Sequence, residues 1–231
     1  MCDFRPAYGE IFHEYIKGYD FWGHCDTDQI FGDIRHFITD GVLDKYDRIL
    51  IRGHFTLYRN TTSVNQIYKK VSSPSYRAVF SSSRNFCFDE TPGTGIYWMK
   101  HLNDRIYNEI VFDDINYKRH EFVTVHKKEH DKGKKNFIYS FERGRLFRVF
   151  EENGKIGKEE TMYVHFQKRK LAIQTDADDC FTIVPNKIIA YVSNPTIEFL
   201  RKEAHKKLVY WPLLSIKLRT LKRKTTALFR K

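Results

Sequence analysis

The sequence predicts a mixed α/β fold with a β-rich second half. In the first half, stretches with apolar residues at helical spacing alternate with short extended runs. Residues 119–191 instead contain six short β-like runs joined by polar turns. This order favours an α/β or mixed domain with an antiparallel portion. The chain has 231 residues, 41% of them hydrophobic, which is enough to bury a core in one domain.

The first half begins with a predicted helix over residues 8–16, which ends at Gly18. Its apolar residues recur near helical spacing at Tyr8, Ile11, Phe12, Tyr15 and Ile16. The apolar run over residues 20–25 predicts a strand, and two more are expected at Ile49–Ile51 and Phe55–Tyr58. A second helix is predicted to start at Thr61 or Thr62 and to continue through residue 71.

The predicted β-rich half follows a glycine-containing loop at residues 92–95, which leads into a helix with Trp98 in its core-facing part. The β-like runs are HEFVTVH, NFIYSFE, LFRVFEE, TMYVHFQ, CFTIVP and KIIAYV. The lysine-rich stretches KKEHDKGKK and ENGKIGKEE are predicted to be solvated turns. Asp113-Asp114 and the acidic residues at 176, 178 and 179 are also expected in turns, because neither cluster follows a strand as clearly as Asp26 does. TDADD, residues 175–179, also lacks the spacing and glycine of a calcium loop.

The positive charge is concentrated at the C-terminal end. The formal net charge is +11, and from Thr196 onward eleven Lys and Arg residues face two Glu residues, which gives +9. Residues 1–195 therefore carry only +2. A nucleic-acid-binding body would carry excess charge over a folded face with stacking aromatics, so we expect no nucleic-acid partner.

Residues 196–231 are predicted to form a basic amphipathic helical tail behind a domain over residues 1–195. Ile197, Leu200, Ala204 and Leu208 recur at helical spacing, and Trp211 and further apolar residues follow among lysines and arginines. Such a segment can lie on an anionic membrane surface. It can equally form a helix that packs on the domain with a solvated cationic end.

Cysteine usage and hydropathy predict the compartment. Four scattered cysteines, without CxxC spacing, suggest neither a zinc ribbon nor a disulfide framework. The N-terminus lacks the pattern of a signal peptide, and no run of 18 apolar residues occurs. We therefore expect a cytoplasmic protein, with peripheral contact at the inner face of the plasma membrane if the tail binds lipid.

Asp26 and Asp28 directly follow the apolar run that contains Phe21 and Trp22. In an extended segment, residues i and i+2 project to the same side, so the two carboxylates can converge on one Mg²⁺ or Mn²⁺ ion. The alternative is that Asp28 caps a helix formed by QIFGDIRHFI, residues 29–38, while Asp26 is merely exposed.

Four segments in order resemble a known family: GYDFWGHCDTDQIFGDIRHFI, RGHFTLYRN, FDETPGTGI and YVHFQKRK. They resemble bacterial glycosyltransferases of polysaccharide assembly, whose fold is similar to the glycosyltransferase type A arrangement, a mixed sheet flanked by helices. The resemblance extends from about Cys2 to Tyr191. It implies metal-dependent transfer of a sugar from a nucleotide-sugar donor to a cell-surface glycan or a lipid-linked acceptor.

The resemblance also implies roles for individual residues. Asp26 and Asp28 match the DxD motif that holds the Mn²⁺ or Mg²⁺ ion on the donor diphosphate. Type A enzymes frequently supply a late histidine as a further metal or diphosphate ligand, which here is His165; a lone histidine on a strand can equally be a structural residue. Lys168, Arg169 and Lys170 follow it and could hold phosphate oxygens, or could form a solvated turn.

The acceptor side is predicted from two other segments. An inverting transferase needs a carboxylate to deprotonate the acceptor hydroxyl, and Asp89 or Glu90 is the candidate base; either could instead cap the following turn. In RGHFTLYRN, Gly53 allows close approach of a substrate, and the side chains of His54, Arg59 and Asn60 offer polar contacts.

The chain begins only one predicted helix ahead of the DxD strand. By the resemblance, βα units that bind the nucleotide base would lie before Met1, so we expect an N-terminally truncated type A arrangement. This leaves a second hypothesis for the function, in which the chain is a non-catalytic glycan- or membrane-associated remnant of such an enzyme.

Overall fold

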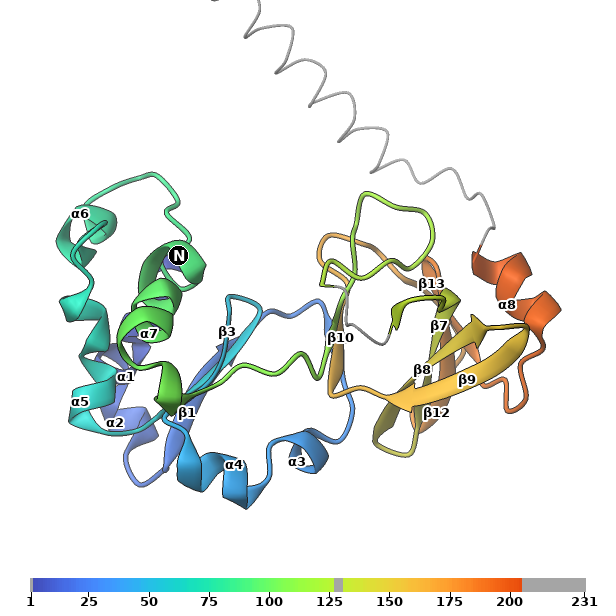
Figure 1. Cartoon of the computed structure of the whole chain (residues 1–231), viewed down its shortest axis with the longest axis horizontal. Coiled ribbons are helices and arrows are strands. Elements are labelled where there is room, and N and C mark those ends of the chain that lie inside the picture. Colours follow the sequence, from blue (N-terminus) through green and yellow to red (C-terminus); the bar gives the residue numbers. More distant parts are fainter. Residues whose placement is uncertain (1, 127–130, 205–231) are drawn as a thin grey trace, which may run out of the picture. The chain divides into compact units, whose positions relative to one another are not determined.

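The computed structural model describes residues 2–126 and 131–204. The described chain forms two compact units: the first contains residues up to Thr27 and Arg35–Glu109, and the second contains Asp28–Ile34 and the residues from Ile110 onward. Together they contain three mixed sheets, a β-rich second half and a short C-terminal helix, which confirms the predicted mixed α/β class (Figure 1).

The first unit is built on a four-stranded sheet. The strand order is β1 (Phe21–Cys25), β4 (Phe55–Arg59), β3 (Arg48–Arg52) and β5 (Ile106–Tyr107). The β1/β4 and β4/β3 pairs are antiparallel, whereas β3 and β5 are parallel. The three strands predicted near residues 20–25, 49–51 and 55–58 are therefore confirmed.

Short helices surround this sheet. The predicted helix over residues 8–16 is confirmed but is broken at Phe12, and Gly18 follows it with a φ of +88°. The helix predicted at Thr61 is also divided in two, and the Thr61 hydroxyl caps it by accepting from the Val64 amide. The helical elements are η1 (Cys2–Ala7), α1 (Tyr8–Ile11), α2 (His13–Ile16), α3 (Ile34–Phe37), α4 (Asp40–Lys45), α5 (Thr62–Asn65), η2 (Ile67–Lys70), α6 (Tyr76–Phe80), η3 (Thr91–Gly95), α7 (Ile96–His101) and η4 (Asn103–Arg105).

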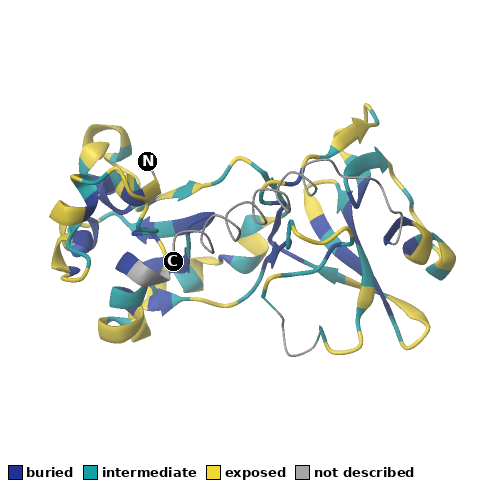
Figure 2. Cartoon of the chain, turned by 90° about the horizontal axis from the view of Figure 1, so that it is seen from above, coloured by how far each residue is buried: buried dark blue, intermediate teal, exposed yellow. Residues whose placement is uncertain are grey.

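The core of the first unit lies between the sheet and the helices. Trp98 is 1% exposed, as the sequence predicted, and packs in a cluster with Trp22 and Tyr58. The Trp22 and Tyr58 rings stack with their centroids 4.6 Å apart. Figure 2 shows the buried residues concentrated along the strands, with exposed residues on the outer helices. This packing fixes the ends of β1, β3 and β4.

The second unit contains two sheets. In the smaller one, β10 (Tyr163–His165) lies between β2 (Gln29–Phe31), with which it is antiparallel, and β6 (Asp113–Asp114), with which it is parallel. The larger sheet has the order β11 (Ala172–Gln174), β13 (Lys187–Ala190), β12 (Cys180–Val184), β7 (Lys135–Glu142), β8 (Arg145–Glu152) and β9 (Lys155–Glu160). Its β11/β13 pair is parallel and its other pairs are antiparallel.

Three local predictions were wrong. Residues 29–31, predicted as the start of a helix, form β2, because they pair with β10. Asp113 and Asp114, predicted in a turn, form the buried strand β6 on the other side of β10. Much of ENGKIGKEE is not a turn but the strand β9, which pairs with β8 along its full length. For β2 and β6, pairing with a strand distant in the sequence decides the conformation, whereas β9 pairs with β8, the strand directly before it in the chain.

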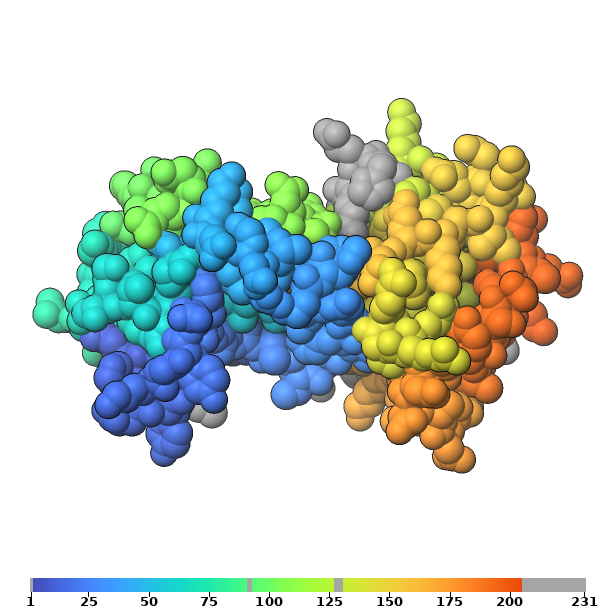
Figure 3. All heavy atoms as spheres, turned by 90° about the horizontal axis from the view of Figure 1, so that it is seen from below, coloured from blue at the N-terminus to red at the C-terminus, as the bar shows by residue number. Residues whose placement is uncertain are grey.

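The C-terminal helix α8 (Ile197–Ala204) packs on the larger sheet. Its Leu200 is fully buried against Ile138, Val149 and Val184, and its Arg201 donates to both carboxylate oxygens of Glu151. Figure 3 shows α8, in red-orange, lying against the yellow and orange atoms of this unit. The rest of the predicted tail lies outside the described residues, so the predicted boundary at residue 195 stays a prediction. Within residues 2–126 and 131–204, no helix combines the length and the apolar character needed to cross a membrane.

Candidate functional site

His165 is the centre of a polar cluster inside the second unit. It lies on β10, the middle strand of the smaller sheet, where it is paired with Asp114 of β6 on one side and with Gln29 of β2 on the other. The side chain is only 9% exposed. Because β10 is central, the position of the imidazole is fixed by backbone pairing on both sides.

Two carboxylates lie at the two nitrogens of this imidazole. Nδ1 of His165 is 2.8 Å from Oδ1 of Asp114, and the same oxygen accepts a hydrogen bond of 2.9 Å from the Gln167 side chain. Nε2 of His165 lies 3.3 Å from Oδ1 of Asp28, whose side chain is 40% exposed. A buried carboxylate thus orients the ring, and the other ring nitrogen faces a more accessible carboxylate.

This arrangement fits a divalent cation. Two ligand atoms about 2.1 Å from one ion and at right angles to each other lie about 3 Å apart, close to the observed separation of His165 Nε2 and Asp28 Oδ1. Histidine ligands of metals commonly place their second nitrogen against a carboxylate, as His165 does with Asp114. The second unit therefore contains two side chains, Asp28 and His165, whose spacing would allow them to hold a metal ion.

Asp28 itself is positioned by the strand pairing. Its carbonyl oxygen accepts a 3.0 Å hydrogen bond from the Phe166 amide, directly after β10. The alternative interpretation, that Asp28 caps a helix over residues 29–38, is wrong, because Gln29 starts a strand and α3 begins only at Ile34.

Asp26 belongs to the first unit, at the end of β1. Its amide donates a 2.9 Å hydrogen bond to the carbonyl oxygen of His54, which ties the end of β1 to the turn after β3. Its carboxylate is ion-paired with Arg5, with Oδ1 2.5 Å from Nη2. One residue, Thr27, separates Asp26 from Asp28 in the chain.

The two candidate bases differ in their surroundings. Asp89 is 2% exposed and accepts a hydrogen bond of 3.1 Å from Arg5, whereas Glu90 is exposed. Burial raises the pKa of Asp89, although the charge of Arg5 opposes this. Loss of solvent around its carboxyl group and the negative charge of Asp89 raise the pKa of Glu90. The residue Glu90 is exposed and the pKa of its carboxyl group is raised, and both properties suit a general base.

The loop that carries Asp89 and Glu90 is hydrogen-bonded to the buried guanidinium of Arg48. Arg48 is fully buried under the aromatic rings of Tyr58 and Trp98. Its guanidinium donates to the carbonyl oxygen of Asp89 at 3.2 Å and to the hydroxyl of Thr94 at 3.4 Å. These contacts join both ends of the loop to β3.

Gly53 lies against this loop, where the chain's own carboxylates approach it closely, and the predicted approach of a substrate stays a prediction. A Cβ atom at Gly53 would collide with Oε1 of Glu90 and would lie 3.0 Å from Oδ2 of Asp89. Its carbonyl oxygen accepts from Arg5 at 2.5 Å. A side chain at this position would therefore displace both candidate bases.

Arg59 and Asn60, predicted as substrate contacts, are used within the first unit. Arg59 donates to Asp47 and to backbone carbonyl oxygens of residues 43, 44 and 46. The Asn60 amide donates to the carbonyl oxygens of Ile16 and Tyr19. His54 is 7% exposed. The contacts of Arg59 and Asn60 give these two residues structural roles.

The basic residues after His165 also differ from one another. Arg169 is 5% exposed and donates to several backbone carbonyl oxygens of residues 116–121 and to the Asn186 side chain. Lys168 and Lys170 are exposed, and the Lys168 ammonium lies over the Tyr117 ring, 5.5 Å from its centroid. Of the three, the two lysines have the exposure that a phosphate ligand needs.

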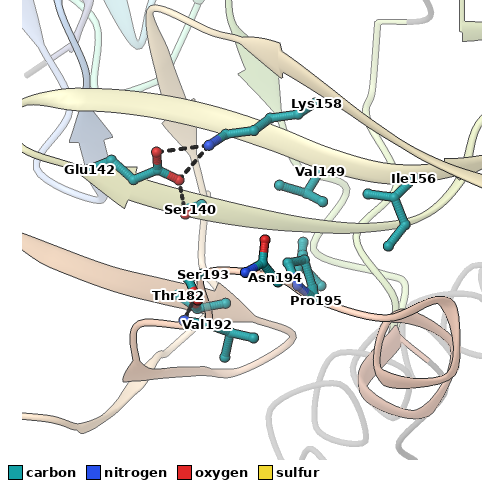
Figure 4. A pocket seen from close by; sticks show the side chains of 11 residues that line it. Ser140, Glu142, Val149, Ile156, Lys158, Thr182, Val192, Ser193, Asn194 and Pro195 are labelled. Carbon is teal, nitrogen blue, oxygen red and sulfur yellow. Dashed lines mark hydrogen bonds and ion pairs between the residues drawn. The ribbon is translucent and has the colours of Figure 1, made fainter.

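A separate pocket of about 290 Å³ lies on the larger sheet of the second unit (Figure 4). Its floor is apolar, and the Lys158 ammonium contacts both carboxylate oxygens of Glu142 at 2.7 Å at one end. The residues that line it are Ile138, Ser140, Glu142, Val149, Ile156, Lys158, Thr182, Val192, Ser193, Asn194 and Pro195. None of the predicted site residues lines this pocket.

Sequence reasoning missed three residues that the structure places beside candidate site residues: Asp114 beside His165, and Arg5 and Arg48 beside Asp89. Asp114 was dismissed as a turn residue, and Arg5 and Arg48 were not considered. The adjacent apolar residues of VFDDINY were a signal for a short strand, and an arginine directly before the apolar run Ile49–Ile51 was a signal for a buried charge. Arg5 had no comparable signal.

A protein-family model described as "Family of unknown function (DUF6625)" matches residues 1–192. The chain belongs to this family. The DUF6625 region covers the residues around His165 and the residues around Arg5 and Asp89. No curated protein matches the chain. No solved structure matches it either.

Proposed function

We propose that this DUF6625 protein is a metal-dependent glycosyltransferase that moves a sugar from a nucleotide-sugar donor to a cell-surface glycan or lipid-linked acceptor. The single observation that carries the proposal is the placement of Asp28 and Asp114 at the two nitrogens of His165. This is the arrangement expected of a metal-binding histidine, and it occurs at the carboxylate motif that the resemblance assigns to the cation.

The resemblance assigns Asp26, Asp28 and His165 to the cation, and the geometry of the second unit supports Asp28 and His165 as ligands. A bound Mn²⁺ or Mg²⁺ ion would supply positive charge against the diphosphate of the leaving group. The imidazole favours Mn²⁺, because Mg²⁺ is bound mainly by oxygen ligands. Asp114 holds His165 in the orientation that directs Nε2 toward Asp28.

Glu90 is the proposed general base. It is exposed, and its raised pKa improves its ability to accept the proton of an acceptor hydroxyl. Asp89 is buried and paired with Arg5, so we assign it a positioning role in place of the base. Because Gly53 has no side chain, both carboxylates can lie against its backbone.

The lysines after β10 are the proposed contacts to donor phosphate. Lys168 and Lys170 are exposed and follow His165 within five residues. Arg169, Arg59 and Asn60 are left out of the proposed substrate contacts, because their donors are used inside their own units.

The finer predictions of fold and location belong to the same proposal. A type A-like arrangement is supported by the mixed sheet of the first unit, with β1 leading into the DxD segment. Cytoplasmic location, with peripheral contact at the inner face of the plasma membrane, fits a lipid-linked acceptor. The basic residues of the tail after Ala204, which would make this contact, lie outside the described residues.

The test is hydrolysis of nucleotide sugars in the presence of Mn²⁺. The full chain is assayed against a panel of uridine, guanosine, cytidine and thymidine diphosphate sugars, alone and with Asp26→Ala or Asp28→Ala. The proposal predicts release of nucleoside diphosphate from at least one donor, dependent on Mn²⁺ and lost in both variants with the fold retained. Glycan or vesicle binding without any such hydrolysis would favour the non-catalytic remnant.

A further inference from the structure

The Arg5 guanidinium bridges three acceptors of the first unit. Nη2 donates to Asp26 at 2.5 Å, while Nη1 donates to the carbonyl oxygen of Gly53 at 2.5 Å and to Asp89 at 3.1 Å. The Arg5 side chain is 15% exposed, whereas that of Asp26 is 32% exposed. One partly buried cation therefore neutralises two carboxylates to which the proposed function gives different roles.

The backbone that carries Arg5 is anchored independently of these contacts. Asp3, in the same helical turn η1, accepts hydrogen bonds from the amides of Phe86 and Phe88 at 2.9 and 2.7 Å. This fixes η1 beside the loop that carries Asp89. Arg5 is thus held in place even when one of its own side-chain contacts is broken.

A guanidinium and a divalent cation are both counterions of a carboxylate. Oδ1 of Asp26 is occupied by Arg5 at 2.5 Å, so a cation bound through this oxygen has to replace that contact. Arg5 does not need to leave the cluster for this, because its other nitrogen remains bound to Asp89 and Gly53. The contacts of Arg5 therefore allow a counterion exchange, in which Arg5 releases the Asp26 carboxylate and retains the Asp89 carboxylate.

We infer that Arg5 is the internal counterion of Asp26 and exchanges with the divalent cation, so that Arg5 sets the cation affinity of the proposed site. The inference rests on the proposed function and adds a residue, Arg5, that competes with the proposed cation for Asp26. The guanidinium weakens cation binding in two ways. It occupies the Asp26 carboxylate, and its positive charge repels the incoming ion.

The test measures Mn²⁺ affinity by isothermal titration calorimetry on the full chain and on Arg5→Gln. Arg5→Gln removes the charge and the contact with Asp26, so the dissociation constant is expected to fall on the order of tenfold. Arg35→Gln is the matched control, since Arg35 is in the same unit, forms an exposed ion pair with Asp40 and contributes the same charge. Its affinity is expected to equal that of the unmodified chain.

Arg5→Lys keeps the inference testable if Arg5→Gln does not fold, as judged by circular dichroism. An ammonium group cannot reproduce the two-nitrogen fork of the guanidinium, so a smaller gain in affinity is expected. Equal affinity in the unmodified chain and the Arg5 variants would overturn the inference and leave the proposed function standing. Weaker binding in the Arg5 variants would also overturn it. Binding by none of the proteins would overturn both.

Discussion

Nδ1 of His165 lies 2.8 Å from Oδ1 of Asp114, across the parallel pairing of β10 with β6. Both side chains are buried, and Gln167 donates to the same carboxylate oxygen. The pair therefore has a fixed geometry, and in the proposed site Asp114 orients the ring of His165.

Asp114→Asn is expected to lower Mn²⁺ affinity by about 10-fold to 100-fold, the cost of removing the outer partner of a metal-binding histidine. The amide keeps the shape of the side chain but loses the charge that fixes the imidazole. The measurement is calorimetric titration with Mn²⁺. Asp176→Asn, in an exposed loop of the same unit, is the control. An unchanged affinity in Asp114→Asn would show that the pair serves only the packing of the sheet.

Glu90→Gln is expected to lower the turnover number for sugar transfer or hydrolysis by about 100-fold to 10,000-fold, which is the usual contribution of a general base. Mn²⁺ affinity should stay the same, because Glu90 is not a proposed ligand. The comparison needs steady-state rates and calorimetry on the same preparations. Asp89→Asn is the instructive contrast: it should chiefly lower the melting temperature, since it leaves Arg5 without one partner. A full rate in Glu90→Gln would exclude Glu90 as the base.

His24 should make the stability of the first unit depend on pH. Burial and the positive charges of Arg5 and Arg48 lower the pKa of His24 to about 3, compared with about 6.5 in an unfolded chain. Between these two pKa values, His24 is protonated in the unfolded chain and neutral in the folded chain. The free energy of unfolding therefore falls as the pH falls below about 6.5, by up to about 1.4 kcal/mol per pH unit.

Urea unfolding of the full chain between pH 7 and pH 5 measures this effect. His24→Gln should show a flatter dependence on pH than the unmodified chain. His13→Gln is the control, because the His13 side chain is 64% exposed. If the unmodified chain and His24→Gln keep parallel curves, His24 is not the residue that titrates.

Leu200→Ala should lower the free energy of unfolding of the second unit by about 2 to 5 kcal/mol, because it leaves a cavity beneath α8. Urea unfolding followed by circular dichroism measures the change. Glu198→Ala, an exposed substitution on the same helix, should change it by less than about 0.5 kcal/mol. A small effect of Leu200→Ala would mean that α8 contributes little to this unit.

The sequence predicted the strands whose own residues carry a clear pattern. Residues 21–25, 48–52 and 55–59 contain compact apolar runs, and β7 and β8 alternate in hydrophobicity, so local pattern and tertiary pairing agree there. The helix after Thr61 was predictable for a similar reason, because its cap lies in the sequence directly before it.

The parts that were missed depend on contacts distant in the sequence. Ile30, Phe31, Ile34, Phe37 and Ile38 recur near helical spacing, yet β2 forms, because β10, more than 130 residues later, pairs with it. Asp114 looked like a turn residue until β6 was placed beside β10. Arg5 is more than 80 residues from Asp89, so no local pattern could connect them. The sequence therefore predicted Asp26, Asp28, Asp89 and Glu90 as candidate residues. It did not predict Asp114, which orients His165, or Arg5, which neutralises Asp26 and Asp89.

Calorimetric titration of the full chain with Mn²⁺, repeated with Asp28→Asn and His165→Gln, tests the central claim most directly. The account predicts one ion bound per chain, Mn²⁺ in preference to Mg²⁺, and affinity reduced at least tenfold in each variant while circular dichroism remains unchanged. Binding of equal strength in all three proteins, or no binding in any of them, would contradict it.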